Sequence, residues 1–230
     1  MTLEAVIFSG IGTLAEVAEL DRAAWNAAFR AHGVDWHWSW DVYAELMRQG
    51  GDRQLAARYA AYLGHVVDAN ALDRTHQRQF ATMLAGGVPL RPGVARVMNW
   101  AARGGVKLAL VSRAEIEPVR ALLKATARER GGVAFDVAIL RDDASHMAPH
   151  PAGMVAAITK LGIGQGRAVA VVDTALTREA AQAAGLPFVG FSGRLAQSEA
   201  EVFEAADHTH ALSPEALTSA WRGITNQAAE

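Results

Sequence analysis

The stretch AVIFSGIGTL, residues 5–14, constrains the fold more than any other part of the chain. Four apolar residues run into Ser9, and two glycines separated by an isoleucine follow. A short apolar run that ends in glycine is typical of a buried strand in a parallel sheet. In open parallel sheets, ligands bind outside the carboxyl ends of the strands. The stretch therefore predicts a central strand over residues 3–8 and a ligand or substrate site from Ser9 to Thr13.

Beyond residue 94, short apolar runs alternate with segments of helical periodicity. The runs predict strands at residues 106–111, 135–140, 168–172 and 188–191, and the segments predict helices at 94–103, 115–130, 151–161, 177–184 and 213–222. Such alternation is typical of right-handed crossovers in a parallel sheet. We therefore expect an α/β fold, a doubly wound parallel sheet, over residues 1–14 and 88–230.

Residues 15–87 have no strand-like run and predict an inserted α-helical cap. Helical spacing covers residues 41–48, 52–63 and 68–84, and a first helix precedes Gly33. Trp36, Trp38 and Trp40 alternate within this region, which would place them on one side of an extended segment. They either line a ligand pocket, or pack together inside the cap or against a second copy in a homodimer.

Composition excludes several classes of protein. The net charge is -2 and no long basic run occurs, so we expect no nucleic-acid partner and no anionic membrane surface. The chain has no cysteine, which excludes disulfides and thiolate chemistry. No apolar stretch reaches about 18 residues, and no signal-peptide pattern occurs at the start. A cytoplasmic protein with one core domain and one insertion is the expectation.

Polar residues follow three of the predicted strands, and their arrangement carries a family resemblance. Ser9, Ser112 and Asp173 lie at strand ends, and a loop at residues 142–151 follows another strand. With DRAAWNAAF (21–29), LRPGV (90–94) and AAQAAGL (180–186), this order resembles the haloacid dehalogenase-like (HAD) hydrolases. The chain looks closest to the branch of phosphoglycolate phosphatases and β-phosphoglucomutases, in which a helical cap follows the first strand.

The resemblance implies a set of reacting groups that this chain largely lacks. In the family, an Asp at the first strand's end attacks phosphorus, and a second Asp two residues later acts as acid and base. Ser9 and Ile11 stand at these two positions. A serine hydroxyl is a weak nucleophile without an adjacent base, and isoleucine transfers no proton. Thr13 matches the threonine that follows the second Asp in the family.

The remaining family positions are only partly kept. Ser112 matches the hydroxyl that holds phosphate, and His146 stands where the family has a lysine. The last acidic pair is Val172–Asp173, so Asp173 is the only retained carboxylate. One carboxylate beside a hydroxyl and an isoleucine makes a poor octahedral cage for Mg²⁺.

These departures favour a non-catalytic relative of the phosphatases that binds an anion or a partner and needs no cofactor. A small anionic or phosphorylated ligand would be held by Gly10, Gly12, Thr13, Ser112, Arg113 and His146. The alternative is an Mg²⁺-dependent phosphomonoester hydrolase with a rearranged site, in which Ser9, Asp142 or Asp143 takes over.

Other interpretations of the same residues stay open at this point. The Ser9 hydroxyl could simply satisfy strand-end backbone groups, and Thr13, Ser112 and Asp173 could cap helices. His146 and His150, near Asp142 and Asp143, either bind Zn²⁺ or lie on an exposed loop, which Pro149 and Pro151 favour.

Overall fold

The computed structural model describes residues 2–49, 54–195 and 209–227. The chain forms two compact units. Unit 1 comprises residues 1–16, 89–115 and 126–230, and unit 2 comprises residues 17–88 and 116–125. The assignment of residues 15–87 as a cap stays a prediction, and the structure groups the helix at 116–125 with that region.

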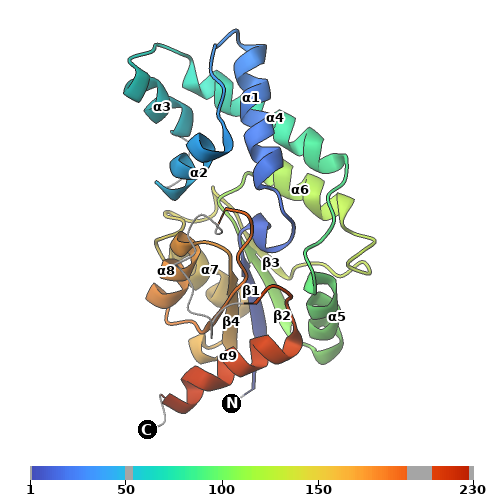
Figure 1. Ribbon diagram of the computed structural model, residues 1–230. Coiled ribbons are helices and arrows are strands. Elements are labelled where there is room, and N and C mark those ends of the chain that lie inside the picture. Colours follow the sequence, from blue (N-terminus) through green and yellow to red (C-terminus); the bar gives the residue numbers. More distant parts are fainter. Residues whose placement is uncertain (1, 50–53, 196–208, 228–230) are drawn as a thin grey trace. The chain divides into compact units, whose positions relative to one another are not determined.

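Unit 1 is built on a five-stranded parallel sheet with strand order β3-β2-β1-β4-β5 (Figure 1). The strands are β1 (Ala5–Ser9), β2 (Lys107–Val111), β3 (Val137–Ile139), β4 (Ala168–Val172) and β5 (Phe188–Gly190). With helices on both faces, this is the α/β fold that the sequence predicts. β1 lies in the centre and all five of its residues are buried.

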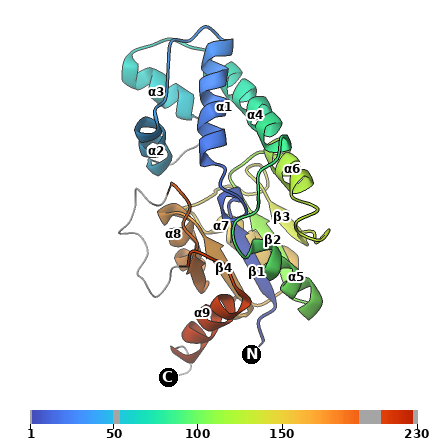
Figure 2. The same cartoon turned by 45° about the vertical axis from the view of Figure 1, so that its right-hand side comes forward.

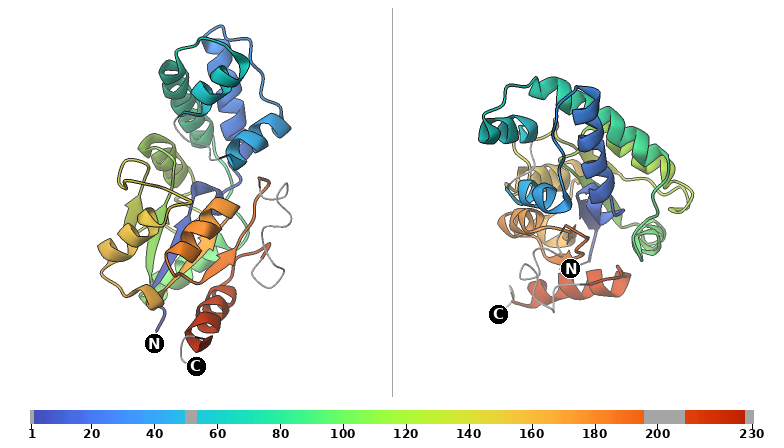
Figure 3. Two further views of the ribbon diagram at one scale, coloured as in Figure 1. Left: turned by 90° about the vertical axis from the view of Figure 1, so that its left-hand side faces the viewer. Right: turned by 45° about the horizontal axis from the view of Figure 1, so that its top comes forward.

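Both faces of the sheet are covered, which explains why the strands are continuous apolar runs. α7 (Ala152–Leu161) and α8 (Ala175–Ala183) pack on the face that carries Ile7, Ala109 and Ala170. The alternate strand residues face α5 (Val94–Gly104) and α9 (Pro214–Gln227), which contact each other and β2, β4 and β5 (Figure 3).

Several element boundaries differ from the sequence prediction, among them those of the third strand and of the helix after the second strand. The strand predicted at 135–140 is shorter, Val137–Ile139, and just before it the Asp136 carboxylate accepts a hydrogen bond from the Leu108 amide (2.7 Å). The helix predicted at 115–130 is α6, Ile116–Ala125. It is followed by turns, in which the Arg130 side chain donates to Thr126 Oγ1 (3.2 Å).

Unit 2 is entirely helical in its described part. It contains α1 (Ala18–Ala31), α2 (Trp40–Arg48), α3 (Leu55–Leu63), α4 (Ala69–Ala85) and α6. α4 packs along both α1 and α6, as Figures 1 and 2 show. The helix predicted from residue 52 begins at Leu55, and residues 52–53 lie outside the described residues.

A buried polar network joins α1, α2 and α4. His76 Nε2 lies 2.8 Å from Asp21 Oδ1, and the Tyr43 hydroxyl donates to Asp21 Oδ2 (2.7 Å). The Trp25 ring stacks on the His76 imidazole at 4.0 Å between centroids. Because each of these groups has a partner inside the unit, the network fixes the three helices together.

Two of the three alternating tryptophans are packed inside unit 2. Trp36 and Trp38 are buried, and both rings contact Phe29 and Tyr59. The Trp38 backbone exchanges two hydrogen bonds with the Asn26 side chain. For Trp36 and Trp38 the packing interpretation is therefore confirmed, while Trp40 begins α2 and is only partly buried.

No helix in the described part of the chain is both long enough and apolar enough to span a membrane.

Candidate functional site

The ends of β1, β2 and β4 lie side by side, so the predicted site residues meet at one edge of the sheet. Ser9 pairs in register with Val111 and Val172, which places Ser112 and Asp173 one residue beyond it on the flanking strands. We call residues 9–13, 112–113 and 173 the strand-tip site.

The turn after β1 is built on one glycine and one threonine. Gly10 has a φ of 100°, a conformation that favours glycine. The Thr13 hydroxyl donates to the Gly10 carbonyl (2.6 Å) and closes a 3-10 turn over Ile11–Thr13. Thr13 is fully buried, so its hydroxyl holds the turn. In the part of the chain that the structure describes, the amides of Ile11 and Gly12 have no hydrogen-bond acceptor.

Asp173 lies against this turn. A Cβ atom on Gly12 would be 2.2 Å from Asp173 Oδ2, and one on Gly10 would be 3.6 Å from both carboxylate oxygens. Thr177 Oγ1 donates to Asp173 Oδ1 (3.3 Å). The N-cap of α8 is Thr174, whose side chain accepts from the Thr177 amide, so the interpretation of Asp173 as the cap is wrong. The carboxylate faces the strand-tip site instead.

The Asp173 carboxyl has a raised pKa of about 6. Desolvation by the surrounding protein is the main cause, although part of the residue is accessible. The positive charges of Arg91 and Arg113 and the hydrogen bond from Thr177 lower the pKa but do not offset the burial. Near neutral pH, a fraction of Asp173 is therefore protonated.

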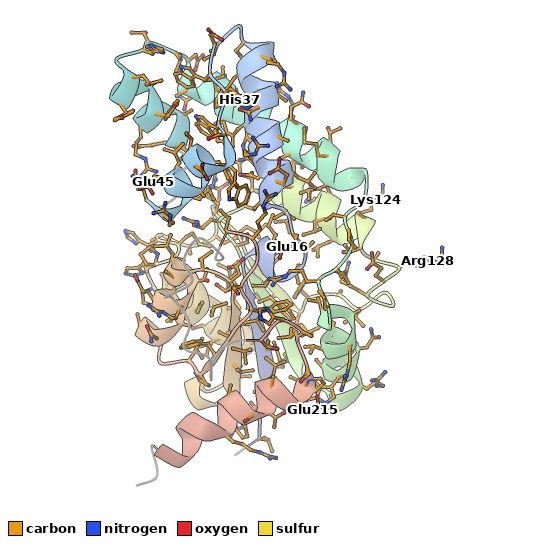
Figure 4. The ribbon with its side chains drawn as sticks, in the orientation of Figure 1. Glu16, His37, Glu45, Lys124, Arg128 and Glu215 are labelled. Carbon is orange, nitrogen blue, oxygen red and sulfur yellow. The ribbon has the colours of Figure 1, made fainter. Side chains whose placement is uncertain are left out.

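Sequence reasoning missed the buried guanidinium of Arg91. It donates to the carbonyls of Gly12 (2.9 Å), Phe191 (2.7 Å) and Ser192 (2.7 Å), and it lies 3.6 Å from the centre of the Phe191 ring. Its Nε pairs with Glu16, labelled in Figure 4, at 3.1 Å. Burial lowers the pKa of Arg91, but an arginine stays charged at any physiological pH. In the sequence, Arg91 stands out only as part of the segment LRPGV, which carries the family resemblance. That segment does not indicate what the arginine contacts.

The side chain of Ser9 does not have the surroundings of a nucleophile. Ser9 is 2% exposed, and its in-register neighbours Val111 and Val172 are both apolar. Among the described residues, no base hydrogen-bonds to its hydroxyl. Ile11, at the acid/base position, is 8% exposed and apolar. Among the described residues, Ser9 therefore has no activating base, and the side chain of Ile11 has no titratable group.

Ser112 keeps its place beside the site but is not a helix cap. Its hydroxyl accepts a hydrogen bond from the Ala114 amide (3.1 Å), two residues on, while α6 begins only at Ile116. The bond closes a local serine turn that orients the hydroxyl. The interpretation of Ser112 as a helix cap is therefore wrong. A ligand contact from Ser112 or Arg113 stays a prediction.

His146 is exposed on its loop. Its Nδ1 lies 3.2 Å from Ser145 Oγ, and its ring centre is 4.9 Å from that of His150. Among the described residues, His146 makes no hydrogen bond to the strand-tip site. His150 Nδ1 accepts from the Ala152 amide (3.1 Å), and Asp143 accepts from the Leu140 amide (2.8 Å). No group of three or more metal-ligating side chains occurs in the described ranges, so the geometry does not favour the Zn²⁺ interpretation.

The residues present do not fit a bound Mg²⁺. Mg²⁺ requires near-octahedral oxygen coordination with at least one or two carboxylates. Asp173 is the one carboxylate that, among the described residues, lies against the β1 turn, and the nearby charges that act on it are those of Arg91 and Arg113. Ile11 offers no oxygen from its side chain.

Comparison with known proteins decides the family. The model of the haloacid dehalogenase-like hydrolases matches residues 6–185. The chain belongs to this family. It is similar to Protein CbbY of Rhodobacter capsulatus, with 33% identity over 82% of this chain and 85% of that one. Protein CbbY of Cereibacter sphaeroides is 34% identical over 80% and 82% of the two chains.

Solved structures of the HAD family show the same fold. CbbY from Rhodobacter sphaeroides, solved in complex with phosphate and, as a point mutant, with xylulose-(1,5)bisphosphate, has a TM-score of 0.77. It is 32% identical over 84% of this chain and 88% of that one. β-Phosphoglucomutase from Clostridium difficile has a TM-score of 0.78 at 16% identity, covering 98% and 99% of the chains, and supports the fold alone.

Proposed function

We propose that this HAD-family protein binds a small phosphorylated or otherwise oxyanionic ligand at the strand-tip site and does not hydrolyse phosphate esters. One observation carries the proposal: at the end of β1, Ser9 has a buried hydroxyl with no base beside it among the described residues, and Ile11 has an apolar side chain. Without a carboxylate at either position, an aspartyl phosphate cannot form.

The groups that remain at the site suit an oxyanion. The amides of Ile11 and Gly12, which have no acceptor in the part of the chain that the structure describes, and the hydroxyl of Ser112 can donate hydrogen bonds, and Arg113 adds positive charge. One similar protein, CbbY from Rhodobacter sphaeroides, has been solved with phosphate and, as a point mutant, with a bisphosphate bound, which supports this class of ligand.

The experiment compares catalysis and binding in the same preparation. We expect no turnover of a generic phosphomonoester with Mg²⁺ above the uncatalysed rate. We also expect inorganic phosphate to bind by calorimetry, with about tenfold weaker binding in Arg113→Gln, since one charged contact contributes about 1.5 kcal/mol. The matched control is Arg120→Gln on the exposed face of α6, which should leave binding unchanged.

Hydrolysis is the rival function, and the similarity to CbbY over most of the chain favours it. Turnover that requires Mg²⁺ and is lost in Asp173→Asn would establish the hydrolase and refute the proposal that the site does not hydrolyse phosphate esters. A cytoplasmic location and the absence of a nucleic-acid partner stay predictions.

A further inference from the structure

We propose that the strand-tip site binds its oxyanion without a divalent cation, because it offers few oxygen ligands for one and the fixed guanidinium of Arg91 lies beside it. This inference rests on the proposed anion-binding function and adds how the ligand's charge is accommodated. It departs from the Mg²⁺ dependence that is usual among HAD hydrolases.

The first step is the charge of the site. A site with several carboxylates repels an anion until a cation offsets them. Among the described residues, Glu16 is paired with Arg91 at 3.1 Å, and the charges of Arg91 and Arg113 both act on Asp173. The carboxylate that lies against the β1 turn thus faces two positive charges, so an anion can approach without a metal ion.

The second step is that Arg91 cannot move away. Its guanidinium donates to three backbone carbonyls, stacks on the Phe191 ring and is 6% exposed. One of those carbonyls belongs to Gly12, in the turn against which Asp173 lies. A divalent cation beside Asp173 would therefore meet a fixed positive charge as well as too few oxygen ligands.

The first test measures Mg²⁺ by itself. Calorimetric titration of Mg²⁺ into the full chain should give no binding isotherm. The double variant Ser9→Asp/Ile11→Asp should gain at least about tenfold in Mg²⁺ affinity, because it adds two carboxylate ligands to the one that Asp173 supplies. The matched control, Ser9→Asn/Ile11→Asn, has side chains of the same size without charge and should gain nothing.

Folding of the double variant is checked by circular dichroism. If burial of two new carboxylates unfolds it, the single variant Ile11→Asp replaces it, and a rise in its melting temperature with Mg²⁺ is the readout. Mg²⁺ binding by the natural chain that is lost in Asp173→Asn would overturn the proposal, as would the lack of any gain in both acidic variants.

The second test titrates inorganic phosphate in EDTA and again in excess MgCl₂. Equal dissociation constants support the proposal. Phosphate binding that occurs only with MgCl₂ overturns it while leaving the anion-binding function intact. No phosphate binding in either buffer overturns the function itself and this inference with it.

Discussion

Asp173 is the residue on which most of the site's electrostatics depends. Its pKa is raised from 3.8 to about 6, so the folded state holds the proton more tightly than the unfolded chain does. The stability that comes from this proton is full below pH about 4 and is lost as the pH rises through about 6. Above that range the protein carries the cost of a desolvated carboxylate.

Asp173→Asn should therefore stabilise the protein at pH 8, since asparagine resembles the protonated form. We expect the free energy of unfolding to rise by roughly 1–3 kcal/mol at pH 8 and to be nearly unchanged at pH 4. Urea unfolding at both pH values checks this. A loss of stability at pH 8 would mean that Arg91 and Arg113 outweigh the desolvation.

Gly12 is the second residue whose identity the structure explains. Its Cβ would lie 2.2 Å from Asp173 Oδ2, so Gly12→Ala must displace that side chain. We expect a loss of about 1–2 kcal/mol in the free energy of unfolding, and most of it should disappear in the Asp173→Ala background. A double-mutant cycle by urea unfolding measures the coupling between positions 12 and 173. Additive losses would show that the cost of Gly12→Ala does not come from its contact with Asp173.

At the scale of elements, Arg91 ties the turn after β1 to the chain that follows β5. Arg91→Lys keeps the charge but cannot supply the planar set of donors that reaches three carbonyls. We expect a loss of about 2–4 kcal/mol, measured by denaturant unfolding. Arg96→Lys is the control, because its ion pair with Glu215 (labelled in Figure 4) is exposed and should change stability by under about 0.5 kcal/mol.

The same scale shows what the sequence could predict. Periodicity indicates the sheet and its strand ends, because apolar runs and the polar residues after them are local patterns. Ser112 and Asp173 could therefore be placed beside Ser9. The role of Arg91 could not, since its partners are carbonyls up to 101 residues away and any residue supplies a carbonyl. The N-cap of α8 is Thr174 and not Asp173, and this choice depends on backbone geometry that the sequence does not give.

At the scale of the whole molecule, the tryptophans bear on whether two copies associate. Trp38 is fully buried inside unit 2 among aromatic rings, so it has no surface to offer a second copy. Trp38→Ala should cost about 3–5 kcal/mol of stability and leave the elution volume in size-exclusion chromatography unchanged. Trp40→Ala, at a partly exposed position, should cost about 1 kcal/mol. A changed oligomeric state in the soluble Trp38 variant would contradict this.

The membership of α6 in unit 2 has a consequence for how this protein can be divided. The chain passes between the units four times, at residues 16/17, 88/89, 115/116 and 125/126. Excision of residues 17–88 would leave the apolar side of α6, with Val119 and Leu122, stripped of α4. The helical unit is therefore not a detachable module: a truncated protein made by bridging residue 16 to residue 89 would expose an uncovered apolar helix and tend to aggregate.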